Sequence, residues 1–272
     1  MEKLMKNKRG LIMGVANDHS IAWGIAKALA AEGAELCLTY QGETLKKRVQ
    51  PLAESVGCNL VLPCDVLDDD NMRSLFGILK DEWGKLDFIV HAIAFSDKNE
   101  LQGRYADTTR ENFKKTMEIS VYSFTQACKY ASELMPDGGS CLTMSYFGAE
   151  KYIPNYNVMG VAKAALEASV RYLAFDLGKQ GVRVNAISAG PIRTLAASGI
   201  GGFRSMLDWN AVNSAKRQNV TIEDMGQSAL YLLSDMSKNV TGEVLHVDAG
   251  ANKQGMVNMD EATTLAELLK AF

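Results

Sequence analysis

The sequence predicts an α/β fold with one doubly wound, seven-stranded parallel sheet. Seven short apolar runs recur along the chain, and a segment of helical periodicity separates each run from the next. Strands that alternate with helices favour a parallel sheet that is covered on both faces, with right-handed crossovers. The 272 residues, of which 47% are hydrophobic, suit one large α/β domain spanning 1–272, without a linker or repeat.

In the first half of the chain, each helix carries a recognisable signal. Gly33 ends a segment of helical periodicity, where glycine commonly caps a helix. Pro51 lies inside the next helix and is expected to kink it or to divide it in two. An Asp-rich turn favours the start of the third helix. The expected strands are 11–16, 35–40, 59–66 and 86–94, and the expected helices are 21–35, 43–57 and 68–83.

The second half continues the alternation, apart from one glycine-dotted segment. We interpret this segment, at about 194–216, as a mobile lid over an apolar substrate, because its glycines stand among apolar residues. A floppy connection is the alternative. The expected helices of this half are 110–135, 155–179 and 222–235, and the expected strands are 140–146, 182–190 and 242–250.

The composition argues against several classes of partner and site. The formal net charge of −3 leaves no basic field to attract nucleic acid or an anionic membrane. The amino-terminal MEKLMKNKRG has the pattern of neither a secretory signal nor a membrane span. Five scattered cysteines without CxxC spacing indicate reduced thiols in a cytoplasmic protein. The three histidines have no ligand spacing, so we expect no metal site.

The turn after the first strand predicts a dinucleotide site. Gly14 follows the strand, and Ser20 and Ile21 open the next helix, whose free amide groups suit a pyrophosphate. The usual GxGxxG is absent, so Ser20 and backbone amides would replace glycines, while Gly24 would allow close helix packing. An ordinary strand–turn–helix with Ser20 as the N-cap explains this motif equally well.

Positions at the ends of the next strands extend this prediction. Gln41 stands where an acidic residue usually holds the adenosine ribose of NAD, and we interpret the cations at 46–48 as surface charge rather than as an NADP signal. Asp65 and Val66 suit the adenine amine, unless Asp65 caps the helix that follows. Ile93 would lie beside the ribose and nicotinamide.

The segment after the sixth strand completes the predicted cofactor site. The Ile192 backbone and the Thr194 hydroxyl are placed to hold a nicotinamide carboxamide, and Ala196 is assigned to the same site. Ligands of open α/β sheets bind at the carboxyl ends of the strands. The joint placement of these positions therefore carries the prediction, since no single motif is decisive.

The segment 145–164, SYFGAEKYIPNYNVMGVAKA, holds the expected catalytic residues Tyr146, Tyr156 and Lys163. Tyr156 and Lys163 are seven residues apart, which is two helical turns, so both would point to one face. The ammonium would stabilise the phenolate and lower the tyrosine pKa from ~10. Such a pair suits a reaction that places negative charge on a substrate oxygen. A tyrosine-bearing helix with a solvated lysine is the alternative.

Together these segments resemble short-chain dehydrogenases/reductases and, more narrowly, the bacterial enoyl-acyl-carrier-protein reductases of fatty-acid synthesis. Usual carbonyl-reducing members carry Tyr-x-x-x-Lys, whereas Met159 stands four residues before Lys163 and the phenol is at Tyr156. This shift disfavours a ketoreductase. The matching motifs, which cover nearly the whole chain, are GVANDHSIAWGIA, SYFGAEKYIPNYNVMGVAKA, VRVNAISAGPIRTLAASGI and GEVLHVD.

The resemblance implies a role for each of these side chains. Tyr156 would hydrogen-bond the thioester carbonyl with help from Tyr146, and Lys163 would bind the nicotinamide ribose. Ser96 would contact substrate, and Ala94 stands where glycine is frequent in well-known relatives. The resemblance also implies a Rossmann-like fold, a homotetramer, an acyl-carrier-protein partner, and NADH as cofactor, with NADPH less favoured.

We therefore expect hydride transfer from NADH to C3 of a trans-2-enoyl thioester through a tyrosine-stabilised enolate. A ketoreductase of the same fold and a non-catalytic NAD(H)-binding sensor or scaffold are the alternatives. A sensor would not need two tyrosines, a lysine and an apolar lid together. The tail DEATTLAELLKAF has helical periodicity, which suits packing on a neighbouring subunit or on its own domain.

Overall fold

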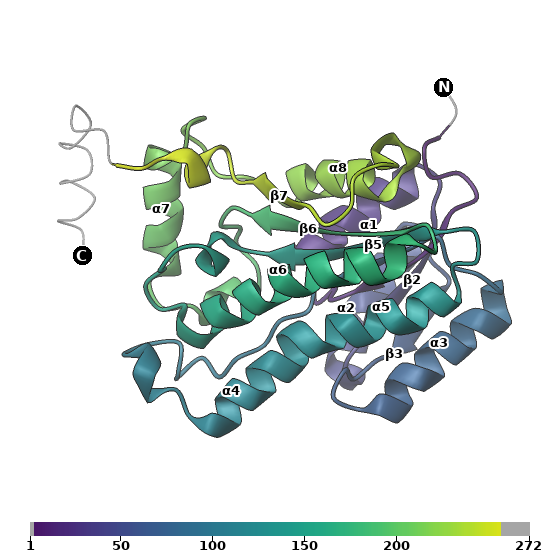
Figure 1. Ribbon diagram of the computed structural model, residues 1–272, viewed down its shortest axis with the longest axis horizontal. Coiled ribbons are helices and arrows are strands. Elements are labelled where there is room, and N and C mark those ends of the chain that lie inside the picture. Colours follow the sequence, from purple (N-terminus) through teal and green to yellow (C-terminus); the bar gives the residue numbers. More distant parts are fainter. Residues whose placement is uncertain (1–2, 257–272) are drawn as a thin grey trace.

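A seven-stranded sheet forms the centre of the computed structural model, which describes residues 3–256 (Figure 1). The strand order is β3-β2-β1-β4-β5-β6-β7, and every neighbouring pair is parallel. The predicted doubly wound sheet is therefore confirmed. The strands are β1 (Arg9–Met13), β2 (Glu35–Tyr40), β3 (Leu60–Pro63), β4 (Phe88–His91), β5 (Gly139–Ser145), β6 (Val182–Ala189) and β7 (Val244–Val247).

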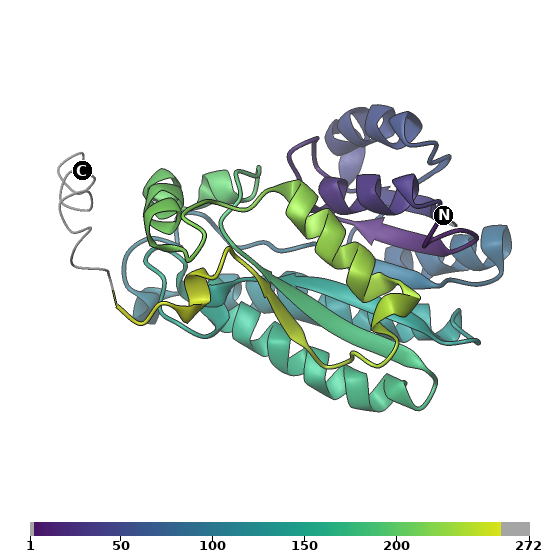
Figure 2. The ribbon, with the colours of Figure 1, turned by 90° about the horizontal axis from the view of Figure 1, so that it is seen from above.

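Helices cover both faces of this sheet (Figure 2). Leu11 and Met13 belong to one buried cluster and Ile12 to the other, because successive side chains of a strand point to opposite faces. Burial on both sides explains why the strands read as continuous apolar runs. The first cluster contains α3 (Asp69–Trp83), α5 (Ser123–Glu133) and α6 (Asn157–Gly178), and the second contains α1 (Ile21–Ala31), α2 (Gly42–Ser55) and α8 (Ile222–Leu233).

The helix signals in the sequence are confirmed for α1 and α3 and only partly tested for α2. Gly33 follows α1 with a φ of +89°, and the next amide, of Ala34, donates to the Leu29 carbonyl at 3.0 Å, so the helix ends at a glycine cap. The Asp-rich turn begins α3. Pro51 lies inside α2, which runs undivided to Ser55, so the expected division is absent, whereas a kink stays a prediction.

The helix expected at 110–135 contains a change of pitch. It consists of α4 (Arg110–Met117), a π-helical segment (Glu118–Tyr122) and α5. The Ser123 hydroxyl donates to the Ile119 carbonyl at 2.6 Å within this region. Such π segments need an extra residue in the turn, which hydrophobic periodicity does not reveal.

The largest departure from prediction lies in the segment 194–216. The sequence predicts a glycine-dotted mobile lid and names no helix there, whereas the chain forms a 3-10 turn (Ala197–Gly199) and the helix α7 (Phe203–Asn213). Gly202, with a φ of +73°, stands at the start of α7. In Figure 2, α7 stands apart from the helices that flank the sheet, beyond the strand ends. The tail DEATTLAELLKAF lies outside the described residues.

The structure also shows the environment of the cysteines and of His91. All five cysteines are buried free thiols. His91 is fully buried between the Ser123 and Thr143 hydroxyls, at 2.8 and 3.1 Å from its ring nitrogens. Within residues 3–256 there is no group of three or more His, Cys, Asp or Glu side chains that could hold a metal ion. None of the helices there is long and apolar enough to cross a membrane.

Candidate active site

Two glycines bring backbone segments together at the predicted cofactor turn. Gly14 follows β1 with a φ of +105°, and a Cβ there would lie 2.2 Å from the Ala92 carbonyl oxygen after β4. A Cβ on Gly24 would lie 2.2 Å from the Ile222 carbonyl oxygen, so α1 and α8 pack as closely as predicted. Only glycine permits both approaches. The crevice between β1 and β4 is the switch point at which α/β sheets bind ligands.

Ser20 stands at the N-cap position of α1, but its side chain serves the preceding turn. Its Oγ accepts hydrogen bonds from the Ala16 and Asn17 amides at 3.0 and 3.1 Å, and it makes no side-chain cap bond to α1. The N-cap alternative is therefore confirmed for the backbone position, whereas the side chain does not cap the helix. The helix begins at Ile21 with no side-chain cap, which suits the binding of an anion at its first amides.

The adenosine end of the predicted site lies at the ends of β2 and β3. Gln41 is exposed at the position before α2. Lys46 lies 3.6 Å from the Glu43 carboxylate, and residues 47–48 are exposed, in agreement with the interpretation of this run as surface charge. Among the contacts of the described residues, none joins a cation of the run 46–48 to the Gln41 side chain.

Asp65 is not the cap of the following helix. Its Oδ1 accepts the Leu67 amide at 3.0 Å in a tight local turn, while Asp68 caps α3 by accepting two amides of its first turn. The capping alternative for Asp65 is wrong, because a residue three positions later does that work. Asp65 stays half-buried beside the buried Val66.

The nicotinamide end of the predicted site lies after β4 and β6. Ile93 and Ile192 are half-buried and pack against the two core clusters. The Thr194 hydroxyl accepts the Ala197 amide at 3.1 Å, which leaves its proton to be donated. Ala196 is exposed next to it. These four positions gather at the carboxyl edge of the sheet.

Ser96 is engaged within its own loop. Its Oγ accepts hydrogen bonds from the Thr116 hydroxyl at 2.9 Å and from the Asn112 side-chain amide at 3.1 Å. It is not among the residues that line the large pocket described below, and Ala94 nearby is exposed. Contact between Ser96 and substrate stays a prediction.

Tyr156 lies at the start of α6 rather than within it. It occupies the position before Asn157, with a φ of −109° and a ψ of −26°. Its ring meets that of Tyr146 edge-on, with 5.0 Å between centroids and 73° between planes. A Cβ on Gly148 would lie 2.5 Å from Tyr156 Cδ1, so that glycine makes room for the ring. The phenol is buried and held on two sides.

Lys163 is buried near the end of β5. Its Nζ donates to the Met144 carbonyl at 2.7 Å, at the end of β5 just before Tyr146. Burial lowers the Lys163 pKa to about 8, against an opposing effect of the nearby Glu167 carboxylate. The structure thus brings Tyr146, Tyr156 and Lys163 to the same end of β5 and α6.

The predicted direction of the Tyr156 pKa is wrong. Burial raises this pKa well above its ordinary value, and the neighbouring Tyr146 adds to the effect. The pKa of Tyr146 is also raised by burial, to about 12. Desolvation disfavours the phenolate, and neither tyrosine's shift is governed by Lys163. Both phenols are therefore protonated at neutral pH.

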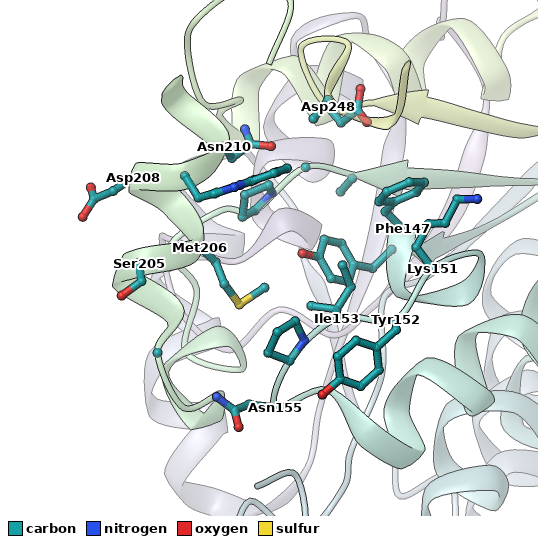
Figure 3. A pocket seen from close by; sticks show the side chains of 18 of the residues that line it. Phe147, Lys151, Tyr152, Ile153, Asn155, Ser205, Met206, Asp208, Asn210 and Asp248 are labelled. Atoms are coloured by element: carbon teal, nitrogen blue, oxygen red, sulfur yellow. The ribbon is translucent and has the colours of Figure 1, made fainter. Parts of the chain in front are cut away.

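A cavity of about 550 Å³ opens beside these residues (Figure 3). Its walls come from the loop between β5 and α6, the end of β6, α7 and the end of β7. Figure 3 shows the Met206 side chain of α7 facing Ile153 across the space. The lining residues include Tyr146, Phe147, Tyr152, Ile153, Pro154, Pro191, Met206 and Trp209.

Comparison with known proteins agrees with this geometry. Residues 14–252 match the family described as enoyl-(acyl carrier protein) reductase. The chain belongs to this reductase family. It is 63% identical, over 94% of its length and 94% of the relative, to enoyl-[acyl-carrier-protein] reductase [NADH] 1 of Rhizobium meliloti.

Solved structures of this reductase family have the same fold. The Anaplasma phagocytophilum enoyl-(acyl-carrier-protein) reductase, solved in complex with NAD, is 60% identical, with a TM-score of 0.92 over 95% of this chain and 99% of that one. The Aquifex aeolicus enoyl-[acyl-carrier-protein] reductase (NADH) is 48% identical, with a TM-score of 0.91 over 93% of this chain and 100% of that one. The predicted Rossmann-like class is confirmed.

In this enoyl reductase, the shifted tyrosine has a structural explanation. Met159, which stands where carbonyl reductases carry their phenol, is buried within the core cluster of α6. It cannot donate a proton, so a phenol at another position must do so. Tyr146 and Tyr152 line the cavity, and Tyr156 packs against Tyr146. Sequence reasoning missed Met206 and Trp209 as pocket residues, although the apolar spacing of FRSMLDW was the signal of a helix there.

Proposed function

We propose that the chain reduces the C2=C3 double bond of trans-2-enoyl thioesters on acyl carrier protein, with NADH, during fatty-acid elongation. The observation that carries this proposal is Tyr146 at the wall of the cavity, with the Tyr156 ring packed edge-on against it and Lys163 buried near the end of the same strand. This arrangement offers a protonated phenol, rather than a base, next to a largely apolar space.

The turn after β1 fits a dinucleotide. Gly14 leaves no room for a side chain, and the first amides of α1 have no side-chain cap. A pyrophosphate supplies the negative charge that such a helix start stabilises. Bound NADH would supply the hydride for C3. Gly14, Ser20 and Ile21 would hold its pyrophosphate, and Asp65 with Val66 its adenine.

The nicotinamide half of the cofactor would lie deeper in the crevice. The Thr194 hydroxyl still has a proton to donate to a carboxamide, and Ile192, Ala196 and Ile93 lie near it at the sheet edge. Lys163 would exchange its bond to the Met144 carbonyl for the ribose hydroxyls, or share itself between them. The neutral Gln41 decides little between NADH and NADPH, and the similarity to relatives named as NADH-dependent reductases favours NADH.

Tyr156 would act as a hydrogen-bond donor to the thioester oxygen. As C3 is reduced, charge moves to this oxygen as an enolate, and a fixed donor stabilises it more than the ground-state carbonyl. The raised pKa of Tyr156 keeps the proton on the phenol, which suits a donor that holds the oxygen without losing its own proton. Protonation of the enolate at C2, by a proton from solvent, would then complete the reduction. Tyr146 would support the ring from the cavity wall.

The lid, the carrier of the substrate and the other subunits would surround the site. The segment 194–216, with Met206 and Trp209 of α7, would close over the acyl chain as a lid. The enoyl chain would arrive on acyl carrier protein in the cytoplasm, and the enzyme would work as a homotetramer. Ser96 would contact substrate once its loop bonds rearrange.

The test is oxidation of NADH by the purified protein with a trans-2-enoyl thioester. The matching 3-ketoacyl thioester and NADPH are measured in parallel. Turnover of the enoyl substrate with NADH supports the proposal. Turnover of the ketoacyl substrate alone identifies a ketoreductase. NADH binding without turnover of either substrate indicates the non-catalytic alternative.

A further inference from the structure

Tyr156 stands between two asparagines with unusual backbone conformations. Asn155 has a φ of +59° and Asn157 a φ of +36°, the left-handed region that residues with a Cβ rarely adopt. Such conformations persist only where surrounding contacts hold them, and they gather at functional sites. The contacts of these two side chains therefore indicate what holds Tyr156 in place.

Asn155 binds the segment that carries α7. Its Nδ2 donates to the Gly201 carbonyl oxygen at 2.9 Å, and the side chain is half-buried. Figure 3 shows Asn155 at the rim of the cavity. The hydrogen bond thus joins the residue before Tyr156 to the lid, immediately before α7 begins.

Asn157 binds a different segment, the loop that follows β4. Its Nδ2 lies 3.3 Å from the Glu100 carbonyl oxygen, 3.4 Å from that of Gln102 and 3.3 Å from that of Gly103. Three carbonyls thus converge on one amide group. The same loop also carries Ser96.

The two bound segments also touch one another. A Cβ on Gly201 would lie 3.0 Å from Gln102 Nε2, and a Cβ on Gly199 would lie 3.8 Å from Lys98 Cβ. The lid and the β4 loop therefore meet beside the turn that contains Tyr156. Both walls are fastened to that turn by its flanking side chains.

We propose that Asn155 and Asn157 are positioning residues that tether the lid and the β4 loop, respectively, to the turn that carries Tyr156. The phenol then reaches its working position only when both segments are in place. This inference rests on the proposed reductase function for its effect on turnover. The tethers themselves can be tested without any substrate.

The variants Asn155→Gly, Asn155→Asp, Asn157→Gly and Asn157→Asp separate the tether from the backbone conformation. Glycine accepts a positive φ more readily than asparagine, and aspartate tolerates it, yet neither side chain can donate to a carbonyl. Asn7→Gly is the matched control, because Asn7 is exposed and has a φ of +64° far from the site in the sequence. It tests the effect of relieving a left-handed conformation alone.

The first measurement is trypsin digestion of the folded protein, with cleavage sites mapped by mass spectrometry. Asn155 variants should be cut faster after Arg204 in the lid, and Asn157 variants faster after Arg104 in the β4 loop. Both arginines are exposed. Asn7→Gly should match the wild type at both sites. Unchanged cleavage in the variants overturns the proposal whether or not the protein is a reductase.

The second measurement is kinetic. The loss of one net hydrogen bond should lower kcat/KM for the enoyl thioester about fivefold in each variant. NADH affinity should fall less than kcat/KM, because neither asparagine is assigned to the cofactor and the bound segments carry only Ile93, Thr194 and Ala196 of its site. Loosened loops with unchanged kcat/KM refute the positioning role. A wild-type protein that turns over no enoyl substrate refutes the proposed function, while the digestion still decides the tethers.

Discussion

At the scale of single residues, the reaction depends on one protonated phenol. Tyr156→Phe removes the donor while the ring keeps its contacts with Gly148 and Tyr146. Loss of one donor of this kind lowers kcat by about 10²–10³. The measurement is kcat with a saturating trans-2-enoyl thioester, together with the thermal midpoint to show that the fold is retained.

Tyr152→Phe is the control for this substitution. Tyr152 lines the cavity beside Tyr146 but is 82% exposed, so its hydroxyl has no buried partner to lose. Its kcat should equal that of the wild type. A Tyr156→Phe enzyme with wild-type kcat would show that the phenol does not stabilise the enolate.

Lys163 predicts a pH dependence of cofactor binding. Burial lowers its pKa to about 8, so the ammonium loses its proton as the pH rises through that value. If the charge helps to hold the ribose and phosphates of NADH, the affinity should decrease above about pH 8, by at most tenfold per pH unit. Fluorescence titration of NADH at each pH measures this decrease.

Lys163→Met supplies the comparison, because it fills the same space without a charge. Its NADH affinity should be weaker below pH 8 and independent of pH around that value. A decrease of the same size in wild type and variant would assign the titration to another group. Turnover is not needed for either result.

The sequence predicts where the site residues lie at the sheet edge, but it does not predict their pKa values. The chain positions of Gly14, Asp65 and Tyr146 follow from the strand pattern, because parallel strands end at one edge. The pKa of Tyr156 does not follow, since it depends on burial and on a second phenol that lies ten residues away in the chain. Spacing predicts a shared face, but it does not predict the local dielectric environment.

At the scale of elements, the contact of α1 with α8 supports the cofactor turn. A Cβ on Gly24 would meet the Ile222 backbone at 2.2 Å, and a Cβ on Gly226 would meet the Gly24 carbonyl oxygen at 2.6 Å. Backbone cannot yield as a flexible side chain can. Gly24→Ala should therefore lower the free energy of unfolding by about 2 kcal/mol through overpacking.

Gly77→Ala is the matched control for Gly24→Ala. Gly77 is also helical, lies in α3, and has nothing within 4 Å of an added Cβ. Alanine there should raise the free energy of unfolding by about 0.5–1 kcal/mol through helix propensity. Urea unfolding measures both variants. Equal stabilisation by both substitutions would contradict the close contact of α1 and α8.

The elements that pack on the sheet could be predicted from the sequence, whereas α7, which lies beyond the sheet, could not. The strands and the helices α1, α3, α6 and α8 pack on the sheet, so their apolar residues recur with a clear period. The helix α7 stands beyond the sheet, and only Leu207, Asn210 and Asn213 of it are buried. Its conformation depends on contacts in the lid rather than on a core-facing stripe.

At the scale of the whole molecule, the outer face of α6 is unusual for a surface. Tyr172 is 76% exposed and Phe175 86% exposed, three residues apart on the same helix. Neighbouring exposed aromatic side chains are typical of protein interfaces. In the proposed homotetramer, α6 would therefore pack against another subunit on the side opposite the sheet. Because α6 also carries Lys163 and begins beside Tyr156, assembly would support the active site from outside.

Phe175→Glu tests this arrangement by placing a charge where an aromatic ring would be buried between subunits. The wild type should sediment with four times the mass of one chain, and the variant as a smaller species, since an unpaired buried carboxylate is strongly disfavoured. Leu4→Glu is the control, because Leu4 is 46% exposed in the N-terminal turn and outside α6. It should leave the mass unchanged. The proposed interface at α6 is contradicted if the wild type sediments as a single chain, or if the Phe175→Glu variant is still a tetramer. If the variant dissociates and its kcat falls at the same time, the contact between subunits holds the catalytic end of α6 in place.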